Sequence, residues 1–350
     1  METLLGKTLT ELQEVALSAG LQKFAGKQLA EWLYVRRVTS FDEMTNISLK
    51  GREALKASYT IGRHVPVREA VSIDGTRKYL FEVGEQFVEA VYIPDEDRAT
   101  LCVSTQAGCK MGCRFCMTGT LGFHGHLTAA EIINQVFEID RMAAANHLSQ
   151  LSNLVLMGEG EPMDNIDAVL RALDILTAPY GCAWSPKRIT VSTVGVPAMK
   201  RFIEESECHL AVSMHDPFPA ERAQIMPAEK IFSITEVVKL LKNYDWAHQR
   251  RVSFEYICWS GKNDTPRHAK ELIRLLRGLP CRINLIRFHD GVEEVATTNK
   301  ESRHFPASNE KQMEWLRDYL TANGITTTIR RSRGEDILAA CGMLVNSLTN

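Results

Sequence analysis

The 350-residue chain has little net charge and no long hydrophobic run, and both absences exclude classes of protein. Its 41 Lys and Arg residues nearly balance its 43 Asp and Glu residues, so any contact with nucleic acid must come from local patches and not from the net charge of −2. No apolar run reaches the roughly 18–20 residues that span a bilayer. The N-terminus becomes acidic and periodic within a few residues, unlike a signal or transit peptide, so we expect a cytoplasmic protein.

The composition also has no low-complexity signal, and the sequence has no internal repeat. Hydrophobic residues make up 45% and charged residues 24% of the chain, with 22 Gly and 12 Pro, which excludes a disordered, collagen-like or fibrous protein. The nine cysteines are an odd number in a long chain, which argues against a disulfide framework. Three of them, Cys109, Cys113 and Cys116, lie close together, so we expect the reactive chemistry there.

The hydrophobic pattern changes twice along the chain and predicts three regions. Residues 1–64 have apolar positions at helical spacing, which predicts a small helical N-terminal domain. Residues 65–99 alternate with period two between turns at Asp74-Gly75 and Gly84-Glu85, which predicts a short antiparallel β extension. Residues 100–345 alternate short apolar runs with amphipathic helices, which is typical of a parallel sheet with helices outside it. The predicted fold class is α/β, a partial (β/α)6 barrel with these two additions.

Polar or reactive residues follow nearly every expected strand of the barrel. The strands are expected at Leu101–Ser104, Leu154–Met157, Ile189–Ser192, Leu210–Ser213, Val252–Ile257, Arg282–Arg287 and Thr326–Ile329. Barrels of this kind carry their chemistry at the carboxyl ends of the strands. The residues at or after these ends are Cys109–Cys116, Gly158–Pro162, Ser192-Thr193, Ser213–His215, His289-Asp290 and Cys341. Their recurrence at one end of the sheet predicts an active site there.

Cys109, Cys113 and Cys116 form a CxxxCxxC pattern directly after the first expected barrel strand. Three thiolates on one loop can bind three irons of a [4Fe–4S] cluster and leave the fourth iron open to a small ligand. A Cys3His zinc site is the alternative, because His124 and His126 are close enough in sequence to supply a fourth ligand. A cluster that only carries electrons is a third interpretation, and it requires protein ligands on all four irons.

The cysteine spacing resembles that of the radical S-adenosylmethionine (SAM) superfamily. Further motifs resemble one family within it, the RlmN/Cfr family of radical SAM RNA adenine methyltransferases, over nearly the whole chain. The matching stretches are Phe41–Asn46, Val88–Pro94, Leu101–Cys109, Gly160–Pro162, Val191–Thr193, Val212–His215, Ile283–Ile286, Thr328–Arg331, Gly334–Ile337 and Ala339–Gly342.

The resemblance implies a radical SAM barrel that holds one [4Fe–4S] cluster on Cys109, Cys113 and Cys116, with SAM at the open iron. The remaining SAM contacts carried over from the family are Gly160, Glu161, Ser192, Ser213, Met214, His215 and His289. Two positions depart from the usual family pattern: Glu159 stands where Met is usual, and His289 stands where Asn is usual.

The resemblance also implies a chemical route that uses two SAM molecules per turnover. SAM methylates Cys341, a deoxyadenosyl radical takes a hydrogen atom from the S-methyl group, and the methylene radical adds to a ring carbon of adenine. That carbon is electrophilic, so a direct transfer of SAM's electrophilic methyl group would fail. Cys102 then resolves the protein–RNA thioether and forms a transient disulfide with Cys341, while Glu89 accepts a proton.

The substrate implied by the resemblance is adenine 2503 of 23S rRNA, methylated at carbon 2, with tRNA adenine 37 left open as a second substrate. Cfr-type methylation at carbon 8 is the alternative. The stretch Gln106–Cys109 lacks the extra cysteine that Cfr-type sequences often carry, which favours carbon 2. A non-catalytic, zinc-dependent RNA-binding module is the second alternative.

The expected partners also follow from the resemblance and from local charge. The family implies a flavodoxin-like reductant and no membrane, and the sequence gives no indication of oligomeric state. Residues 1–64 carry nine Lys and Arg against seven Asp and Glu, so we expect this helical region to bind RNA.

Overall fold

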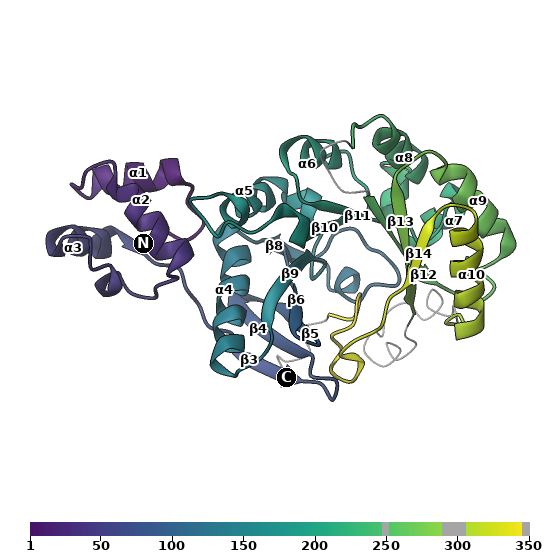
Figure 1. Ribbon diagram of the computed structural model, residues 1–350, viewed down its shortest axis with the longest axis horizontal. Helices are drawn as coiled ribbons and strands as arrows, with labels where there is room; N and C mark the ends of the chain where they lie inside the picture. Colours follow the sequence, from purple (N-terminus) through teal and green to yellow (C-terminus); the bar gives the residue numbers. More distant parts are fainter. Residues whose placement is uncertain (247–251, 289–305, 345–350) are drawn as a thin grey trace.

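The computed structural model describes residues 1–246, 252–288 and 306–344, and its central feature is a ten-stranded mixed sheet. Seven adjacent strands run parallel and form the partial barrel (Figure 1). In spatial order they are β6 (Arg98–Cys102), β9 (Gln150–Leu156), β10 (Ile189–Thr193), β11 (His209–Ser213), β12 (Val252–Cys258), β13 (Cys281–Arg287) and β14 (Thr326–Ile329). Each overlaps one of the expected strands, so the predicted barrel is confirmed, with seven parallel strands in the described part of the chain.

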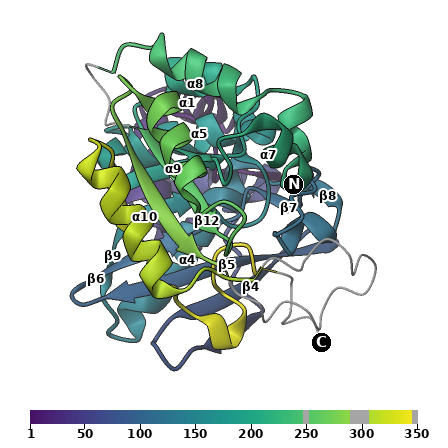
Figure 2. The same ribbon diagram turned by 90° about the vertical axis from the view of Figure 1, so that its right-hand side faces the viewer.

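Amphipathic helices connect the parallel strands and cover the outside of the sheet (Figure 2). They are α4 (Ala129–Ala145), α5 (Ile166–Thr177), α6 (Met199–Glu205), α7 (Pro219–Ile225), α8 (Ile234–Lys242), α9 (Pro266–Leu276) and α10 (Glu310–Ala322). Capping boxes begin two of them: Thr128 at α4 and Ser233 at α8 each exchange hydrogen bonds with a Glu three residues later. All seven residues of β12 are buried, as expected for a strand covered on both faces.

Three antiparallel strands extend the same sheet beyond β6. β3 (Arg68–Val71), β4 (Arg77–Val83) and β5 (Gln86–Asp95) form a meander, which confirms the predicted β extension. β5 then pairs antiparallel with β6, and Val91 lies opposite Cys102. β6 pairs on its other side with β9, so the strand end that carries Cys102 is held from both sides.

The residues before position 65 form helices that lie to one side of the barrel (Figure 1). They are α1 (Leu9–Ser18), α2 (Ala25–Ala30), a π-helical turn (Glu31–Val35), a 3-10 turn (Phe41–Glu43) and α3 (Leu49–Ser58). The periodicity does not predict β1 (Glu2–Thr3) and β2 (Tyr59–Thr60), which pair in parallel. Two-residue strands are too short to show a period, so only the fold reveals them.

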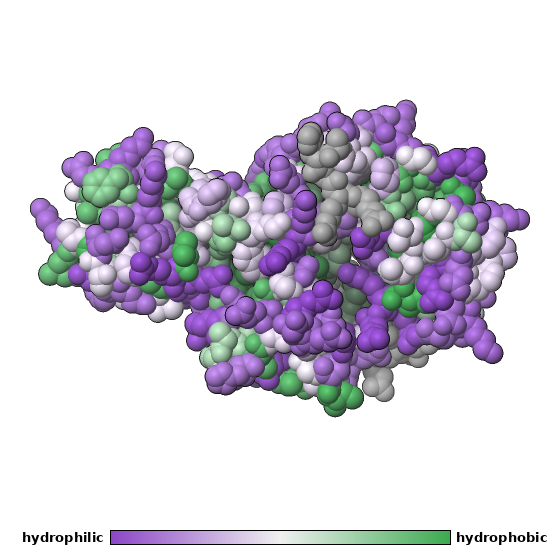
Figure 3. All heavy atoms as spheres, viewed as in Figure 1, coloured by the Kyte–Doolittle hydropathy of each residue, from purple (hydrophilic) through white to green (hydrophobic). Residues whose placement is uncertain are grey.

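Buried polar contacts attach this helical region to α4. Arg63 pairs with Glu138 at 2.7 Å, and these side chains are 4% and 1% exposed. Asn134 exchanges two hydrogen bonds with the backbone of His64, at 3.0 and 2.8 Å. Breaking a buried ion pair by removing one partner costs about 3–5 kcal/mol, so the helical region is held firmly in place. The face shown in Figure 3 is mostly hydrophilic over both parts. In the described ranges, no helix has the length and apolar character needed to span a membrane.

Two loops that carry cysteines meet at the carboxyl ends of the parallel strands. The first lies between β7 (Gln106–Gly108) and β8 (Phe123–His126), which form a short antiparallel hairpin. The second follows β14 and contains a 3-10 turn, Glu335–Ile337. The Met117 N–H donates to the Gly342 carbonyl at 2.8 Å. The loops therefore contact each other directly, although the second lies near the end of the chain.

Candidate active site

A cavity of about 510 Å³ opens at the carboxyl ends of the parallel strands, and most of the predicted site residues line it. These residues are Cys102, Cys109, Cys113, Cys116, Gly160, Glu161, Ser192, Ser213, His215 and Cys341. They come from the ends of β6, β9, β10 and β11 and from both cysteine-bearing loops. The fold thus brings together groups that are spread over most of the sequence.

The three thiols of the CxxxCxxC loop are spaced more widely than the ligands of one metal ion. Within the described residues, the set of three His, Cys, Asp or Glu ligand atoms that lie within 4.8 Å of one another is Asp216, Glu221 and His268, not the cysteines. Thiolates on a single tetrahedral zinc lie about 3.8 Å apart, because each Zn–S bond is about 2.3 Å long. The wider spacing fits three corners of an iron–sulfur cube.

The two histidines that could complete a zinc site are engaged elsewhere. The ring of His126 is hydrogen-bonded to the Gln106 amide at 3.0 Å, and the ring of His124 to the Leu121 carbonyl at 2.8 Å. Neither histidine lines the cavity that the cysteines share. The geometry therefore favours an iron–sulfur cluster over a Cys3His zinc site.

Burial makes the cysteine thiols of this loop poor acids on their own. Desolvation raises the pKa of Cys109 to about 12 and raises the pKa of Cys113 well above its ordinary value. A coordinated metal ion deprotonates such a thiol outright. Three desolvated thiols that face one cavity therefore fit a cationic cluster.

The Gly-x-Gly-Glu-Pro turn after β9 packs against β7, the strand that leads into the cysteine loop. Gly160 has a φ of +99°, and a Cβ there would lie 2.6 Å from the Cβ of Gln106, so a side chain would clash. The Gln106 side-chain oxygen accepts the Glu161 N–H at 2.9 Å. The Glu161 carboxylate accepts N–H groups from Met163 at 3.0 Å and Val194 at 2.8 Å. Burial raises the pKa of Glu161 to about 7.

His215 presents a neutral imidazole to the cavity. Its Nδ1 accepts the Ile257 N–H at 3.0 Å, which assigns the ring proton to Nε2. Burial, and then the charge of Arg222, lower the pKa of His215 to about 3. The ring packs edge-on against Phe115 of the cysteine loop, with 4.6 Å between the ring centroids. His215 can therefore donate a hydrogen bond to a ligand beside the cysteine loop.

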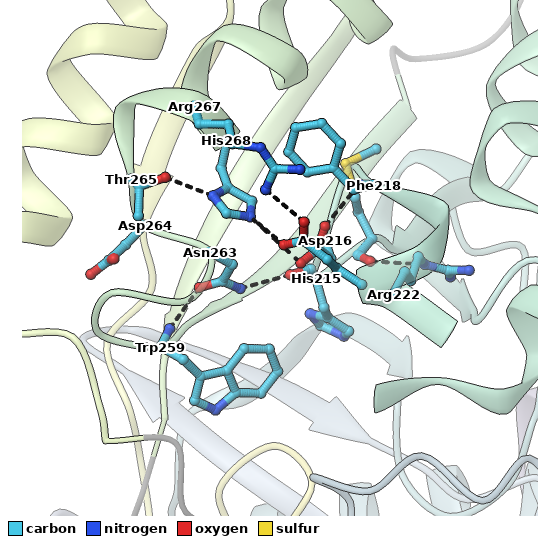
Figure 4. A network of polar contacts seen from close by, with 12 residues as sticks. His215, Asp216, Phe218, Arg222, Trp259, Asn263, Asp264, Thr265, Arg267 and His268 are labelled. Carbon is cyan, nitrogen blue, oxygen red and sulfur yellow. Dashed lines mark hydrogen bonds and ion pairs between the residues drawn. The ribbon is translucent and has the colours of Figure 1, made fainter. Parts of the chain in front are cut away.

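A polar network behind His215 holds it in place (Figure 4). The Asn263 amide donates to the His215 carbonyl at 2.7 Å. Asp216 accepts the Phe218 N–H at 2.8 Å and lies 3.8 Å from the His268 ring. These contacts brace the turn in which His215 has a φ of +55°, a conformation that surrounding structure must support.

Cys102 and Cys341 share the cavity with Arg330. Burial, and then the neighbouring Cys341 thiol, raise the pKa of Cys102 to about 12, while Arg330 acts in the opposite direction. Burial raises the pKa of Cys341 to about 11, again opposed by Arg330. Glu255 pairs with Arg330 at 3.3 Å and accepts a hydrogen bond from Asn284 at 2.8 Å. A fixed cation beside both thiols favours the thiolate form that a nucleophilic sulfur requires.

Two predicted residues do not line the cavity, and a third lies outside the described residues. Met214 is fully buried in the core, and its N–H donates to the Glu255 carbonyl at 3.0 Å. Glu89 is fully buried on β5, where it pairs with Lys78 at 3.0 Å. His289 falls in the range that the structure does not describe.

Sequence reasoning missed the buried arginine that supports the ends of β10 and β11. Arg222 is 0% exposed, and it donates to the carbonyls of Met214, Val194 and Ser213 at 2.9, 2.6 and 2.7 Å. It also forms a buried ion pair with Glu229. No local pattern indicates this role, because an arginine on a short amphipathic helix is usually at the surface.

Comparisons with known proteins identify the family. A family model described as "Ribosomal RNA large subunit methyltransferase N-terminal domain" matches residues 3–61, and one described as "Radical SAM superfamily" matches residues 103–276. A probable dual-specificity RNA methyltransferase RlmN from Bacteroides fragilis is 59% identical over 345 residues, which cover 97% of this chain and 95% of that relative. The chain belongs to the RlmN family of radical SAM RNA methyltransferases.

Other RlmN family members and a solved structure agree with this assignment. A dual-specificity RNA methyltransferase RlmN from Syntrophobacter fumaroxidans is 39% identical over 97% of this chain and 96% of its own length. The crystal structure of a radical SAM methyltransferase from Sphaerobacter thermophilus matches with a TM-score of 0.88 and 36% identity, covering 98% of this chain and 99% of that one. RlmN enzymes use a [4Fe–4S] cluster and SAM, which are therefore the cofactors of this enzyme, and the cavity residues fit both.

Proposed function

We propose that this enzyme methylates carbon 2 of adenine 2503 in 23S rRNA, and that tRNA adenine 37 is a second substrate. The observation that carries the proposal is the presence of Cys102 and Cys341 in the cavity of the CxxxCxxC loop. A direct transfer from SAM needs no protein sulfur, whereas a transfer through sulfur needs one cysteine to carry the methyl group and another to release the product. The relatives named as dual-specificity RNA methyltransferases support RNA as the acceptor.

Each group in the cavity has a separate task in this proposal. The bound cluster and SAM supply the methyl group and the radical. Cys341 carries the methyl group as S-methylcysteine, and Cys102 resolves the thioether between Cys341 and RNA, forming a transient disulfide. Arg330, held by Glu255, favours the thiolate of both cysteines. Glu89 is the proposed proton acceptor, although it does not line the cavity.

Nucleoside mass spectrometry tests the substrate and the target carbon. The gene is expressed in a bacterial strain that lacks its own adenine 2503 methylation, and 23S rRNA and tRNA are digested separately. We expect 2-methyladenosine in both pools. Detection of 8-methyladenosine would show Cfr-type selectivity, and the absence of any methylated adenine in the 23S rRNA would contradict the proposal.

Replacing Cys102 with Ala tests the two-cysteine route. Cys341 remains able to carry the methyl group, but the thioether has no thiolate to resolve it, so protein covalently attached to RNA should accumulate. A denaturing gel should show a slow, nuclease-sensitive band that disappears when Cys341→Ala is added. Cys182→Ala is the control, because Cys182 does not line the cavity. Normal turnover without an adduct in Cys102→Ala would make Cys102 a structural residue.

We also propose a division of labour among three domains: residues 1–64 dock RNA, residues 65–99 extend the sheet, and residues 100–345 hold the reacting groups. The buried contacts with α4 support this, because RNA bound to the helical region would be held at a constant distance from the cavity. We place the enzyme in the cytoplasm, where a flavodoxin-like protein supplies electrons.

Charge reversal on the helical region tests RNA docking. Lys23, Lys27 and Lys50 are exposed there, and each contact with a phosphate contributes about 0.9 to the slope of log affinity against log salt. Replacing all three with Glu should weaken RNA binding and flatten that slope, while iron content stays normal. Unchanged affinity at every salt concentration would limit the region to a packing role.

A further inference from the structure

We propose that Lys78 is a positioning residue for Cys341, because its ammonium group holds the loop that presents this cysteine to the cavity. The inference rests on the proposed function, since it takes Cys341 as the methyl carrier. Three observations support it: a fully buried ion pair, a strained residue in the loop, and a set of anchors that fix the loop on the β extension.

The ion pair joins two adjacent strands of the β extension. Lys78 on β4 lies 3.0 Å from the carboxylate of Glu89 on β5, and both side chains are 0% exposed. Lys78 also donates a hydrogen bond to the backbone carbonyl of Leu338, at 3.3 Å. A buried ion pair is often no more stable than well-packed apolar residues of the same volume, so it is a weak source of stability. Its contact with the loop gives it a positional role instead.

Leu338 is the strained point of the loop. Its backbone is left-handed, with φ 53° and ψ 44°, a conformation that residues with a β-carbon rarely adopt. Such a conformation persists only where neighbouring contacts hold it. The contacts here are the bond from Lys78 to the Leu338 carbonyl and the bond from the Leu338 N–H to the Glu335 carbonyl at 3.1 Å. Leu338 precedes Cys341 by three residues, so its backbone angles direct the chain toward the cavity.

Further anchors on the β3–β4 hairpin fix the start of the loop. The Asp336 carboxylate accepts hydrogen bonds from the Ser72 hydroxyl at 2.5 Å and the Ile73 N–H at 3.1 Å. The Asp74 carboxylate accepts the Gly334 N–H at 3.0 Å.

Contacts with the cluster-binding loop fix the far end. The Met117 N–H donates to the Gly342 carbonyl at 2.8 Å, and the Thr118 hydroxyl donates to the Leu344 carbonyl at 2.9 Å. The buried lysine contact lies between these two sets of anchors, immediately before the cysteine. The β extension therefore serves as the platform on which the methyl-carrying loop is set.

The test uses the anaerobically reconstituted holoenzyme and separates loop position from later chemistry. Lys78→Met alone leaves Glu89 as an unpaired buried charge, so the double variant Lys78→Met/Glu89→Gln, which removes both charges, is the main variant. Lys78→Arg keeps the positive charge, and Lys200→Met removes an exposed lysine on α6 as the matched control. The readouts are iron content, amide hydrogen exchange of residues 334–344, and S-methylation of Cys341 measured without RNA.

In the double variant, we expect normal iron content, loop exchange faster by about tenfold or more, and S-methylation slower by about 100-fold, because small displacements of a reacting atom have effects of that size. Lys78→Arg should recover most of the S-methylation rate, and Lys200→Met should match wild type. Unchanged exchange and S-methylation in the folded double variant would overturn the proposal.

Two further outcomes separate this proposal from the proposed function. Normal S-methylation with loss of RNA methylation would also overturn the positioning role, and would place the pair at the RNA step, where Glu89 is the proposed proton acceptor. Absence of S-methylcysteine at Cys341 in the wild-type enzyme would instead contradict the proposed function, while the exchange measurement would still report whether Lys78 holds the loop.

Discussion

Glu159 is a buried carboxyl group that should make the stability of this enzyme depend on pH. Glu159 is 1% exposed, and its oxygens accept the N–H groups of Glu89 at 2.8 Å and Gly108 at 3.3 Å. Burial, together with the nearby charge of Glu89, raises the pKa of Glu159 from its ordinary value of 4.5 to about 8. The folded state therefore holds this proton more tightly than the unfolded state does. The resulting stabilisation is complete below pH 4.5 and is lost as the pH rises to about 8.

The magnitude follows from the width of this window. Each pH unit is worth about 1.4 kcal/mol, so the wild-type protein should lose on the order of 5 kcal/mol across the window, relative to a variant that cannot titrate there. Glu159→Gln is such a variant, but it places an amide N–H where one backbone N–H needs an acceptor, which costs about 1–3 kcal/mol at every pH. The variant should therefore be less stable than wild type at low pH and more stable at high pH, with a crossover at about pH 6.

Urea unfolding followed by tryptophan fluorescence tests this prediction. Wild type and Glu159→Gln are compared anaerobically, with equal iron content, at pH values on both sides of the crossover. Glu82→Gln on β4 is the control, because Glu82 is exposed and its replacement should leave the pH dependence unchanged. A stability difference between wild type and Glu159→Gln that does not vary with pH would refute the reasoning, and would mean that Glu159 is ionised in the folded protein.

The remaining predictions concern the cluster, the SAM turn and the buried arginine. Cys113→Ala should lose the iron–sulfur cluster, because one iron loses its ligand, and iron analysis against Cys182→Ala checks this; full iron content would contradict the assignment. Gly160→Ala should destabilise the turn by about 1–2 kcal/mol from its left-handed backbone, with more from the clash with Gln106, and should weaken SAM binding in equilibrium dialysis; wild-type affinity would show that the turn is not at the SAM site. Arg222→Met should lower stability by about 3–5 kcal/mol, because it leaves Glu229 unpaired in the core; a thermal midpoint equal to that of wild type would disprove the role of this ion pair.

Local sequence patterns were sufficient for the order of the elements and for the cluster loop. Helical spacing, period-two alternation and capping boxes depend on residues within a few positions of one another, so the barrel strands, the β meander and the starts of α4 and α8 could be read directly. The CxxxCxxC loop is local in the same sense. Cys102 and Cys341 were assigned through family resemblance, since a single cysteine has no local signature of function.

The contacts that build the cavity depend on groups distant in sequence, and these required the three-dimensional structure. The ion pairs of Lys78 with Glu89 and of Arg330 with Glu255 join different strands, so neither residue shows its partner in its own neighbourhood. The burial of Met214 and Glu89 likewise follows from how strands and loops pack, and hydrophobic periodicity alone places a glutamate of a β extension at the surface. The sequence therefore sets which chemical groups are present and on which elements, because that information is local. The closing of the sheet decides which of them face the cavity and which support it from behind, because burial and charge pairing depend on packing across the whole fold.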